Sequence, residues 1–150
     1  MKVLLVSSSG GHFNALQKLS VFWGQHDCCW ITFRTDATET ALKNKNVYWA
    51  YSPTNRNLPN LIRNFILAFQ VILQERPQLI LTTGAGVAVP FIILGKLLGA
   101  KTAFVESFTR IKQLSLSARL AMPFLDVVYV HWQQLKQRYA KAELIISNTL

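Results

Sequence analysis

The sequence predicts an α/β protein with a doubly wound, Rossmann-like parallel sheet. Short apolar runs alternate with longer amphipathic segments along the whole chain, which is the pattern of strands joined by crossover helices. Most of these runs are continuously apolar, as expected for strands that are buried on both faces of a sheet. Two of them end in glycine-containing turns. We therefore expect residues 1–150 to form one domain, large enough to bury its own core.

Seven short apolar runs are the expected strands. Glycine, proline or polar clusters bound each run, which is typical of strands rather than of helices. In chain order the expected strands cover residues 3–6, 28–33, 47–50, 79–81, 101–105, 127–130 and 144–146.

The first two helices are indicated by apolar spacing and by their end signals. The apolar residues that recur on one face of the first helix are Phe13, Leu16, Leu19 and Phe22. We place this helix at about residues 12–23, because Gly24 can end it. Asp36 can cap a short second helix that ends near residues 43–46.

The next helix has an unusual surface. We expect it over residues 60–76, after a proline- and asparagine-containing loop at residues 52–59. Its broad apolar face consists of Leu61, Ile62, Phe65, Ile66, Phe69, Ile72 and Leu73. A helix that is apolar nearly all round is buried or docked. Two interpretations stay open: a core helix covered by a partner, or a membrane or partner contact made by Arg56, Arg63, Phe65 and Phe69.

Three more helices are expected at residues 87–98, 114–122 and 133–139. Right-handed crossovers place all strand-to-helix loops of such a sheet on one edge. The loops at residues 7–12, 82–86 and 106–110 then converge where open α/β sheets bind their ligands.

These loops carry the candidate site residues. Two helix starts that follow glycine turns could hold a diphosphate between them, but glycines can also serve only to permit tight turns. The candidate anion-binding residues are Ser9, Gly10, Gly11, Gly84, Ala85, Gly86 and Ser107. His12 could act as a general base or as a helix cap. Glu106 could bind ligand hydroxyls or pair with Arg110.

The composition of the chain indicates which classes of partner it can bind. Apolar residues make up 51% of it, charged residues 15%, and the formal net charge is +9. Typical soluble domains have about 25% charged residues. A sparse, positive surface favours contact with phosphate-bearing material, either an anionic membrane or nucleic acid. We expect no nucleic-acid binding, because the aromatic residues of the basic segment 110–141 fall within elements that must bury a face.

Cysteine and hydropathy patterns indicate the compartment. Cys28 and Cys29 are adjacent in a strand and point to opposite faces, so we expect free thiols in a reducing cytoplasm. We expect no metal site and no cofactor. Residues 77–95 carry no charge, but the turn at 82–86 and Pro90 interrupt them. We therefore expect no spanning helix and a peripheral position on the cytoplasmic face of a membrane.

Three motifs, at residues 7–12, 83–90 and 104–110, together resemble a known family. This family comprises the polysaccharide-biosynthesis proteins related to the membrane-anchor subunit of the two-part UDP-N-acetylglucosamine transferase of dolichol-linked oligosaccharide synthesis. The chain is also similar, more distantly, to the acceptor-side half of the peptidoglycan N-acetylglucosaminyl transferase.

The resemblance implies a split glycosyltransferase of the GT-B type, of which residues 1–150 form a single acceptor-side half-domain. This half would hold a lipid-diphosphate-linked sugar acceptor, and a separate nucleotide-sugar-binding glycosyltransferase subunit would complete the active enzyme. By position, His12 and Glu106 would be the catalytic candidates, and the two glycine loops would line the acceptor cleft. The alternative is a self-contained nucleotide-binding α/β module with a regulatory role.

Overall fold

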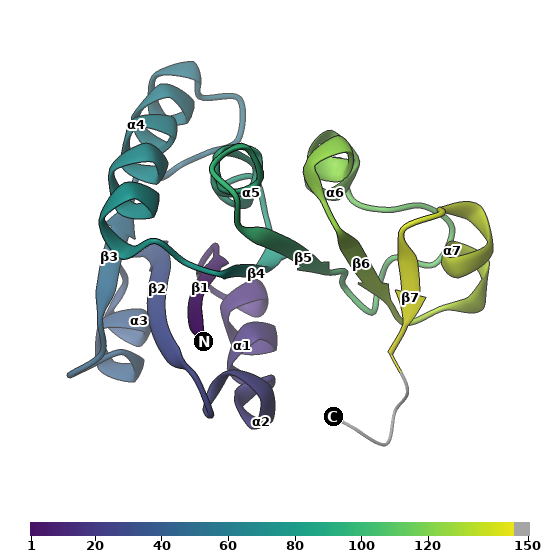
Figure 1. Cartoon of the computed structure of the whole chain (residues 1–150), viewed down its shortest axis with the longest axis horizontal. Helices are drawn as coiled ribbons and strands as arrows, with labels where there is room; N and C mark the ends of the chain where they lie inside the picture. Colours follow the sequence, from purple (N-terminus) through teal and green to yellow (C-terminus); the bar gives the residue numbers. More distant parts are fainter. Residues whose placement is uncertain (146–150) are drawn as a thin grey trace.

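The computed structural model describes residues 1–145, which form a seven-stranded parallel sheet with helices on both faces (Figure 1). The strands are β1 (Lys2–Ser7), β2 (Asp27–Phe33), β3 (Val47–Ala50), β4 (Leu79–Gly84), β5 (Lys101–Val105), β6 (Val127–Val130) and β7 (Ala142–Leu144). The helices are α1 (Gly11–Gln17), α2 (Ser20–Trp23), α3 (Asp36–Ala41), α4 (Leu58–Glu75), α5 (Ala88–Leu97), α6 (Leu116–Ala121), the 3-10 helix η1 (Met122–Phe124) and α7 (Gln133–Arg138). The predicted doubly wound fold is confirmed.

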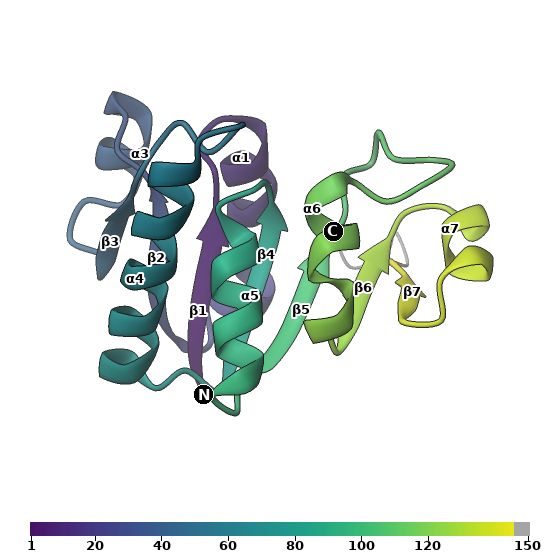
Figure 2. The same ribbon diagram turned by 90° about the horizontal axis from the view of Figure 1, so that it is seen from above.

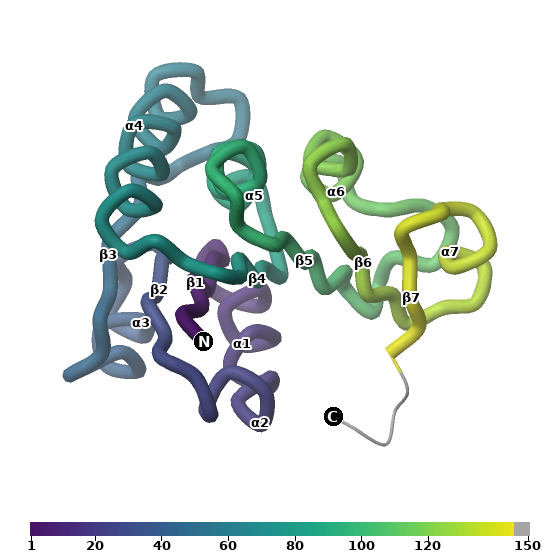
Figure 3. The backbone as a smooth tube through the Cα atoms, in the orientation of Figure 1, coloured from purple at the N-terminus to yellow at the C-terminus, as the bar shows by residue number. Residues whose placement is uncertain are grey.

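The order of the strands across the sheet is β3-β2-β1-β4-β5-β6-β7, and all neighbouring pairs are parallel (Figure 2). The chain winds outward from β1 to β3, returns through α4 to β4, and then winds outward in the other direction (Figure 3). Helices α1, α2 and α3 lie on one face of the sheet, and α4, α5 and α6 lie on the other. The winding therefore changes direction between β1 and β4.

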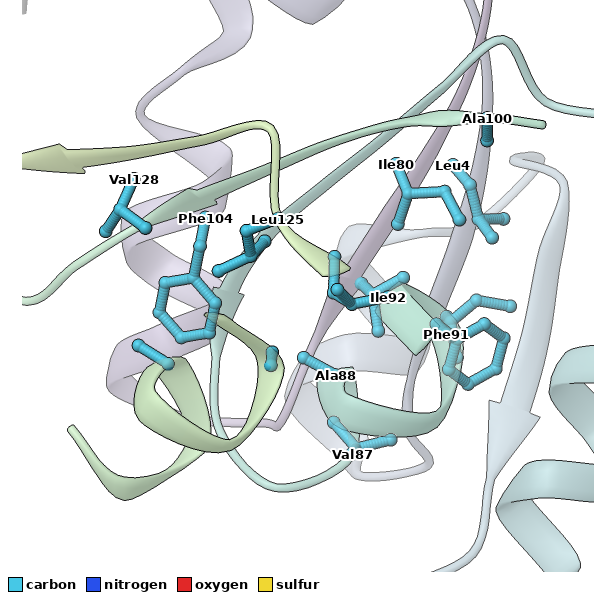
Figure 4. Close-up of a cluster of buried hydrophobic side chains, with 14 of the residues drawn as sticks. Leu4, Ile80, Val87, Ala88, Phe91, Ile92, Ala100, Phe104, Leu125 and Val128 are labelled. Atoms are coloured by element: carbon cyan, nitrogen blue, oxygen red, sulfur yellow. The ribbon is translucent and has the colours of Figure 1, made fainter. Parts of the chain in front are cut away.

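The core consists of two layers separated by the sheet. Val3 and Leu5 of β1 point into the layer under α1, while Leu4 and Val6 point into the layer under α4 and α5. All four side chains are fully buried. Figure 4 shows part of the second layer, where residues of α5 meet side chains from β1, β4, β5 and β6. Burial on both faces explains why the first strand is continuously apolar.

The two adjacent cysteines follow the same alternation. Cys29 is buried in the layer under α4 and α5, and Cys28 is partly buried against the opposite layer. Both thiols are free, as the sequence predicted. Burial is the main cause that raises the pKa of Cys29, to about 12.

The first predicted helix is interrupted, which corrects the expected helix over residues 12–23. Leu19 has a ψ angle of 17°, so α1 ends at Gln17 and α2 begins at Ser20. The indole Nε1 of Trp23 donates a 2.8 Å hydrogen bond to the Leu16 carbonyl oxygen. The same carbonyl accepts from the Leu19 N–H at 3.1 Å, so the indole adds a second hydrogen bond at the interruption.

Other element boundaries also differ from the prediction. Thr35, not Asp36, is the N-cap of α3, because Thr35 and Thr38 form a reciprocal capping box. Strand β4 extends to Gly84, so the polar residues expected in a loop complete a strand. The last strand is Ala142–Leu144 rather than residues 144–146, and residue 146 lies outside the described residues.

Helix α4 buries two of its polar residues, Asn60 and Asn64, and exposes most of the expected apolar face. Asn64 is 1% exposed, its Oδ1 accepts from the Tyr51 N–H at 2.9 Å, and its Nδ2 donates to the Tyr51 carbonyl at 3.0 Å. Asn60 similarly donates to the Pro53 carbonyl at 2.9 Å. The exposed apolar side chains of the helix are Leu58, Leu61, Ile62, Ile66, Phe69 and Leu73. We call this set the α4 apolar stripe. Of the expected apolar face, Ile72 is buried and Phe65 partly buried.

The other end of α4 is attached to the sheet by Glu75. Its carboxylate accepts from Lys2 Nζ at 2.8 Å and from the Tyr48 hydroxyl at 2.7 Å. These two hydrogen bonds, the one from Lys2 first, hold the pKa of Glu75 below its usual value, although burial acts in the opposite direction. No helix within residues 1–145 is both long enough and apolar enough to cross a bilayer.

The close approach of α5 to β4 generates a test of the core. A Cβ added at Gly95 would lie 2.0 Å from Ile80 Cδ1, and Ile80 is fully buried. We predict that Gly95→Ala lowers the free energy of unfolding by about 1–3 kcal/mol, measured by chemical denaturation, because a full core has no room for the methyl group. Adding Ile80→Val removes Cδ1 and should recover part of the loss. If the losses in free energy of unfolding of the two single variants simply add in the double variant, the close contact between Gly95 and Ile80 is contradicted.

Candidate functional site

Two adjoining cavities open where the ends of β4 and β5 meet the start of α1. The larger has a volume of about 790 Å³ and the smaller about 270 Å³. His12, Glu106 and Ser107 line both cavities. The three loops expected to converge at the carboxyl edge of the sheet therefore do so, at the point where the winding changes direction.

His12 is held in a defined orientation at the first turn of α1. Its Nδ1 lies 2.8 Å from the Thr83 carbonyl oxygen, and the Thr83 hydroxyl donates to the His12 carbonyl at 2.6 Å. A carbonyl oxygen can only accept, so Nδ1 carries the hydrogen. In the neutral imidazole Nε2 then has the free lone pair and can take a proton from a hydroxyl.

Gly84 lies directly against this imidazole. Its φ angle is +105°, a conformation that residues with a Cβ rarely adopt. A Cβ built there would lie 3.2 Å from His12 Nδ1. The Gly84 carbonyl also accepts a 2.8 Å hydrogen bond from the Ser8 N–H, which joins the two glycine turns. This position therefore needs glycine for its backbone conformation and to leave room for the imidazole.

Glu106 organises the loop that follows β5. It is 2% exposed, and its two carboxylate oxygens accept from the Ser107 N–H at 2.9 Å and the Ser115 N–H at 2.8 Å. The sequence left open a pairing with Arg110, and the structure shows these two backbone partners instead. A carboxylate that accepts at both ends of residues 107–115 keeps their conformation closed.

The smaller cavity has the chemistry of an anion site. Its lining residues are His12, Gly84, Ala85, Glu106, Ser107, Thr109, Arg110, Ser115, Leu116 and Ser117. Four hydroxyl groups and one guanidinium are suitable donors to phosphate oxygens. Glu106 is the only acidic residue of this lining, and both of its oxygens already have donors.

The larger cavity contains residues that the sequence analysis did not select. Lys18, Phe108 and His131 line it together with Gly11 and the shared residues. The Phe108 ring packs against His131 and Trp132, with ring centroids 5.9 and 5.2 Å apart. One signal could have found His131: it directly follows an expected strand, as Glu106 does, and so belongs to the same edge.

The remaining predicted residues lie around these cavities. Gly11, Gly84 and Ala85 line one or the other, as expected. Ser9 and Gly10 form the turn before α1 and line neither, and Gly86 instead faces Thr54, whose Oγ1 would lie 3.4 Å from an added Cβ. The predicted membrane or partner contacts Arg56, Arg63, Phe65 and Phe69 lie on α4 and the loop before it. Within residues 1–145 no group of side chains could hold a metal ion.

Comparison with known proteins identifies a sequence family. Residues 42–147 match the protein-family model described as "Oligosaccharide biosynthesis protein Alg14 like". The chain is 37% identical over 93 residues to the UDP-N-acetylglucosamine transferase subunit ALG14 of Candida albicans, a match that covers 58% of this chain and 42% of that protein. It is 45% identical over 74 residues to the UDP-N-acetylglucosamine transferase subunit alg14 of Schizosaccharomyces pombe, a match that covers 46% of this chain and 35% of that protein. The matched segments thus span less than half the length of these two relatives.

Solved structures show the same fold. MurG of Acinetobacter baumannii superimposes with a TM-score of 0.76 at 16% identity, over 96% of this chain and 45% of that one. A UDP-GlcNAc 2-epimerase of Methanocaldococcus jannaschii gives 0.73 at 14% identity, over 97% and 45%. The present chain therefore has the fold and the size of one GT-B half-domain.

The contact between Gly84 and His12 generates a test. We predict that Gly84→Ala lowers the free energy of unfolding by about 1–3 kcal/mol and displaces the imidazole, because the new side chain has a strained φ angle and meets Nδ1. Nitrogen-detected NMR of the His12 ring measures the displacement. Gly11→Ala is the matched control, since a Cβ there meets no atom within 4 Å. Unchanged His12 resonances in the Gly84 variant would contradict the assigned contact.

Proposed function

This chain belongs to the family of Alg14-like oligosaccharide biosynthesis proteins, and from that premise we propose that it is the acceptor-side subunit of a two-component glycosyltransferase. Its relatives are named as subunits of a UDP-N-acetylglucosamine transferase. In the proposal, this chain binds a lipid-diphosphate-linked sugar and recruits a separate subunit that binds the nucleotide sugar. The chain matches less than half the length of those relatives. That it takes part in the activity for which they are named is therefore part of the proposal.

The observation that carries the proposal is the position of His12 between two unlike cavities. A diphosphate needs several hydrogen-bond donors and a cation, which the smaller cavity offers through its hydroxyls and Arg110. A sugar hydroxyl that acts as nucleophile needs a base within hydrogen-bonding reach. The lone pair on His12 Nε2 meets that need at the boundary between the cavities.

The proposed reaction is transfer of a glycosyl group to an acceptor hydroxyl. His12 Nε2 takes the hydroxyl proton as the oxygen forms a bond to the anomeric carbon of the donor sugar. The bond from that carbon to the nucleotide diphosphate breaks, and the nucleoside diphosphate leaves on the partner subunit. Glu106 positions Ser107 and the following loop. The remaining lone pairs of its carboxylate can accept hydrogen bonds from hydroxyl groups of the sugar acceptor. The proposal needs no cofactor on this chain.

A peripheral membrane contact through α4 is the second part of the proposal. The α4 apolar stripe is exposed, with Phe69 at 49% and Ile66 at 55%, and Arg56 and Arg63 lie near its beginning. Basic residues gain about 1 kcal/mol each near an anionic leaflet. Thr54, in the loop before α4, lies near Gly86, the residue that follows Ala85 of the smaller cavity. Free thiols and the net charge of +9 support a position on the cytoplasmic face.

Reconstitution tests the division of labour. We expect the isolated chain to transfer no sugar from UDP-N-acetylglucosamine to a lipid-diphosphate-linked sugar, and transfer to begin when the donor-binding subunit is added. In that complex His12→Gln should lower kcat about 10²- to 10⁴-fold, because glutamine cannot take the proton. His26→Gln is the control, since His26 lies outside both cavities.

Two outcomes would contradict this proposal. Robust transfer by the isolated chain would remove the need for a second subunit. Tight calorimetric binding of UDP-sugars to the isolated chain would favour the self-contained nucleotide-binding module instead.

Vesicle flotation tests the membrane contact. We expect the wild-type chain to float with anionic vesicles and Ile66→Ser combined with Phe69→Ser to bind at least tenfold more weakly, because each side chain contributes about 1.5–3 kcal/mol when removed from water. Val21→Ser is the matched control, because Val21 is 75% exposed on α2, across the sheet. Equal loss in the control would show that the stripe has no special part in binding.

A further inference from the structure

We propose that the hydrocarbon chain of a lipid diphosphate leaves the smaller cavity across Leu116 and Leu120 of α6. This inference rests on the proposed function and specifies how that site takes its ligand. It assigns the diphosphate to the polar interior of the cavity and the first part of the lipid to an apolar surface at its edge.

Leu116 belongs to the cavity and to the outer surface at the same time. It lines the smaller cavity beside Ser115 and Ser117, and it is 62% exposed. Leu120 follows one helical turn later on the same face and is 57% exposed. An apolar surface therefore begins in the lining of the polar cavity and continues outward along α6.

The opposite side of α6 carries only small residues. Ala118 and Ala121 are fully buried against the layer under α4, α5 and α6, while both leucines face outward. A surface helix normally places its large apolar residues toward the core and its polar residues outward. Packing of the core does not require the leucines, so another apolar partner accounts for their exposure better.

The charges around this surface fit an anionic amphiphile. Residues 107–125 contain Arg110, Lys112 and Arg119 but neither aspartate nor glutamate. Arg110 lies in the cavity itself, and Ile111 next to it is 45% exposed. A lipid diphosphate has a matching arrangement, because its charged diphosphate lies at one end and its hydrocarbon chain extends away from it.

The α4 apolar stripe does not replace this surface. None of its residues lines the smaller cavity, and α5 lies between α4 and α6 (Figure 1). We therefore assign the α4 apolar stripe to the bilayer and the α6 leucines to the chain of the bound lipid.

Alkyl diphosphates of different length test the inference on the isolated chain. Calorimetry would compare ethyl diphosphate with decyl diphosphate, below the concentration at which the latter forms micelles. We expect wild type to bind the decyl compound at least tenfold more tightly, since burial of two methylene groups is enough for about tenfold. In Leu116→Asn combined with Leu120→Asn this gain should disappear, and ethyl diphosphate should bind as in wild type.

Matched variants separate the inference from the proposed function. Leu97→Asn on α5 and Ile66→Asn on α4 replace similarly exposed apolar residues outside the cavity and should retain the gain. Arg110→Gln should weaken both compounds by the same factor. Two results would overturn the inference while leaving the diphosphate site intact. One is equal affinity for the ethyl and decyl compounds in wild type. The other is a gain in affinity for the decyl compound that is lost in Ile66→Asn but kept in the α6 variant. If wild type binds neither compound, the proposed diphosphate site itself fails.

Discussion

The parallel pairing of β1 with β4 is the constraint on which the rest of the structure depends. The two strands lie at the centre of the sheet, yet the helices that follow them cover opposite faces. The chain must therefore leave the sheet in two directions from neighbouring positions, and this opens the crevice. The bond from Ser8 to the Gly84 carbonyl and the mutual bonds of His12 and Thr83 join the two turns across it. One pairing thus determines both where a ligand can lie and how the imidazole points.

Buried polar groups position the loops of this protein. Asn60 and Asn64 accept and donate along the segment before α4, and Glu106 accepts at both ends of residues 107–115. A buried side chain that satisfies several backbone groups holds a loop firmly, because an unpaired backbone group away from water costs about 1–3 kcal/mol. In α4 the two asparagines share the inner side with Ala68, Val71 and Ile72, and the residues of the α4 apolar stripe face outward.

The exposed apolar residues gather on the face of the sheet that carries α4 and α6. Helix α6 buries only alanines, and α4 buries two asparagines beside Ala68, Val71 and Ile72, while both helices leave large apolar side chains exposed. Arg56 and Arg63 accompany the α4 surface. Basic residues also accompany the α6 surface, and the acidic Asp126 follows only after the α6 segment. The proposed functions of the two surfaces are therefore related: one meets the bilayer, and the other takes the lipid that the cavity holds by its charged end.

The sequence by itself determined the order of strands and helices, the parallel sheet and the edge at which the loops meet. These follow from local patterns, because a continuous apolar run implies burial on both faces and glycine permits the turn after it. Only the tertiary structure decided which side of α4 is buried, which groups Glu106 accepts from, and that His131 and Phe108 join His12 at one cavity. Each depends on groups distant in the chain, such as Thr83 for His12, or on competition between hydrogen bonding and apolar burial. The spacing of residues along the sequence cannot predict such contacts, because they depend on which surfaces the completed sheet brings together.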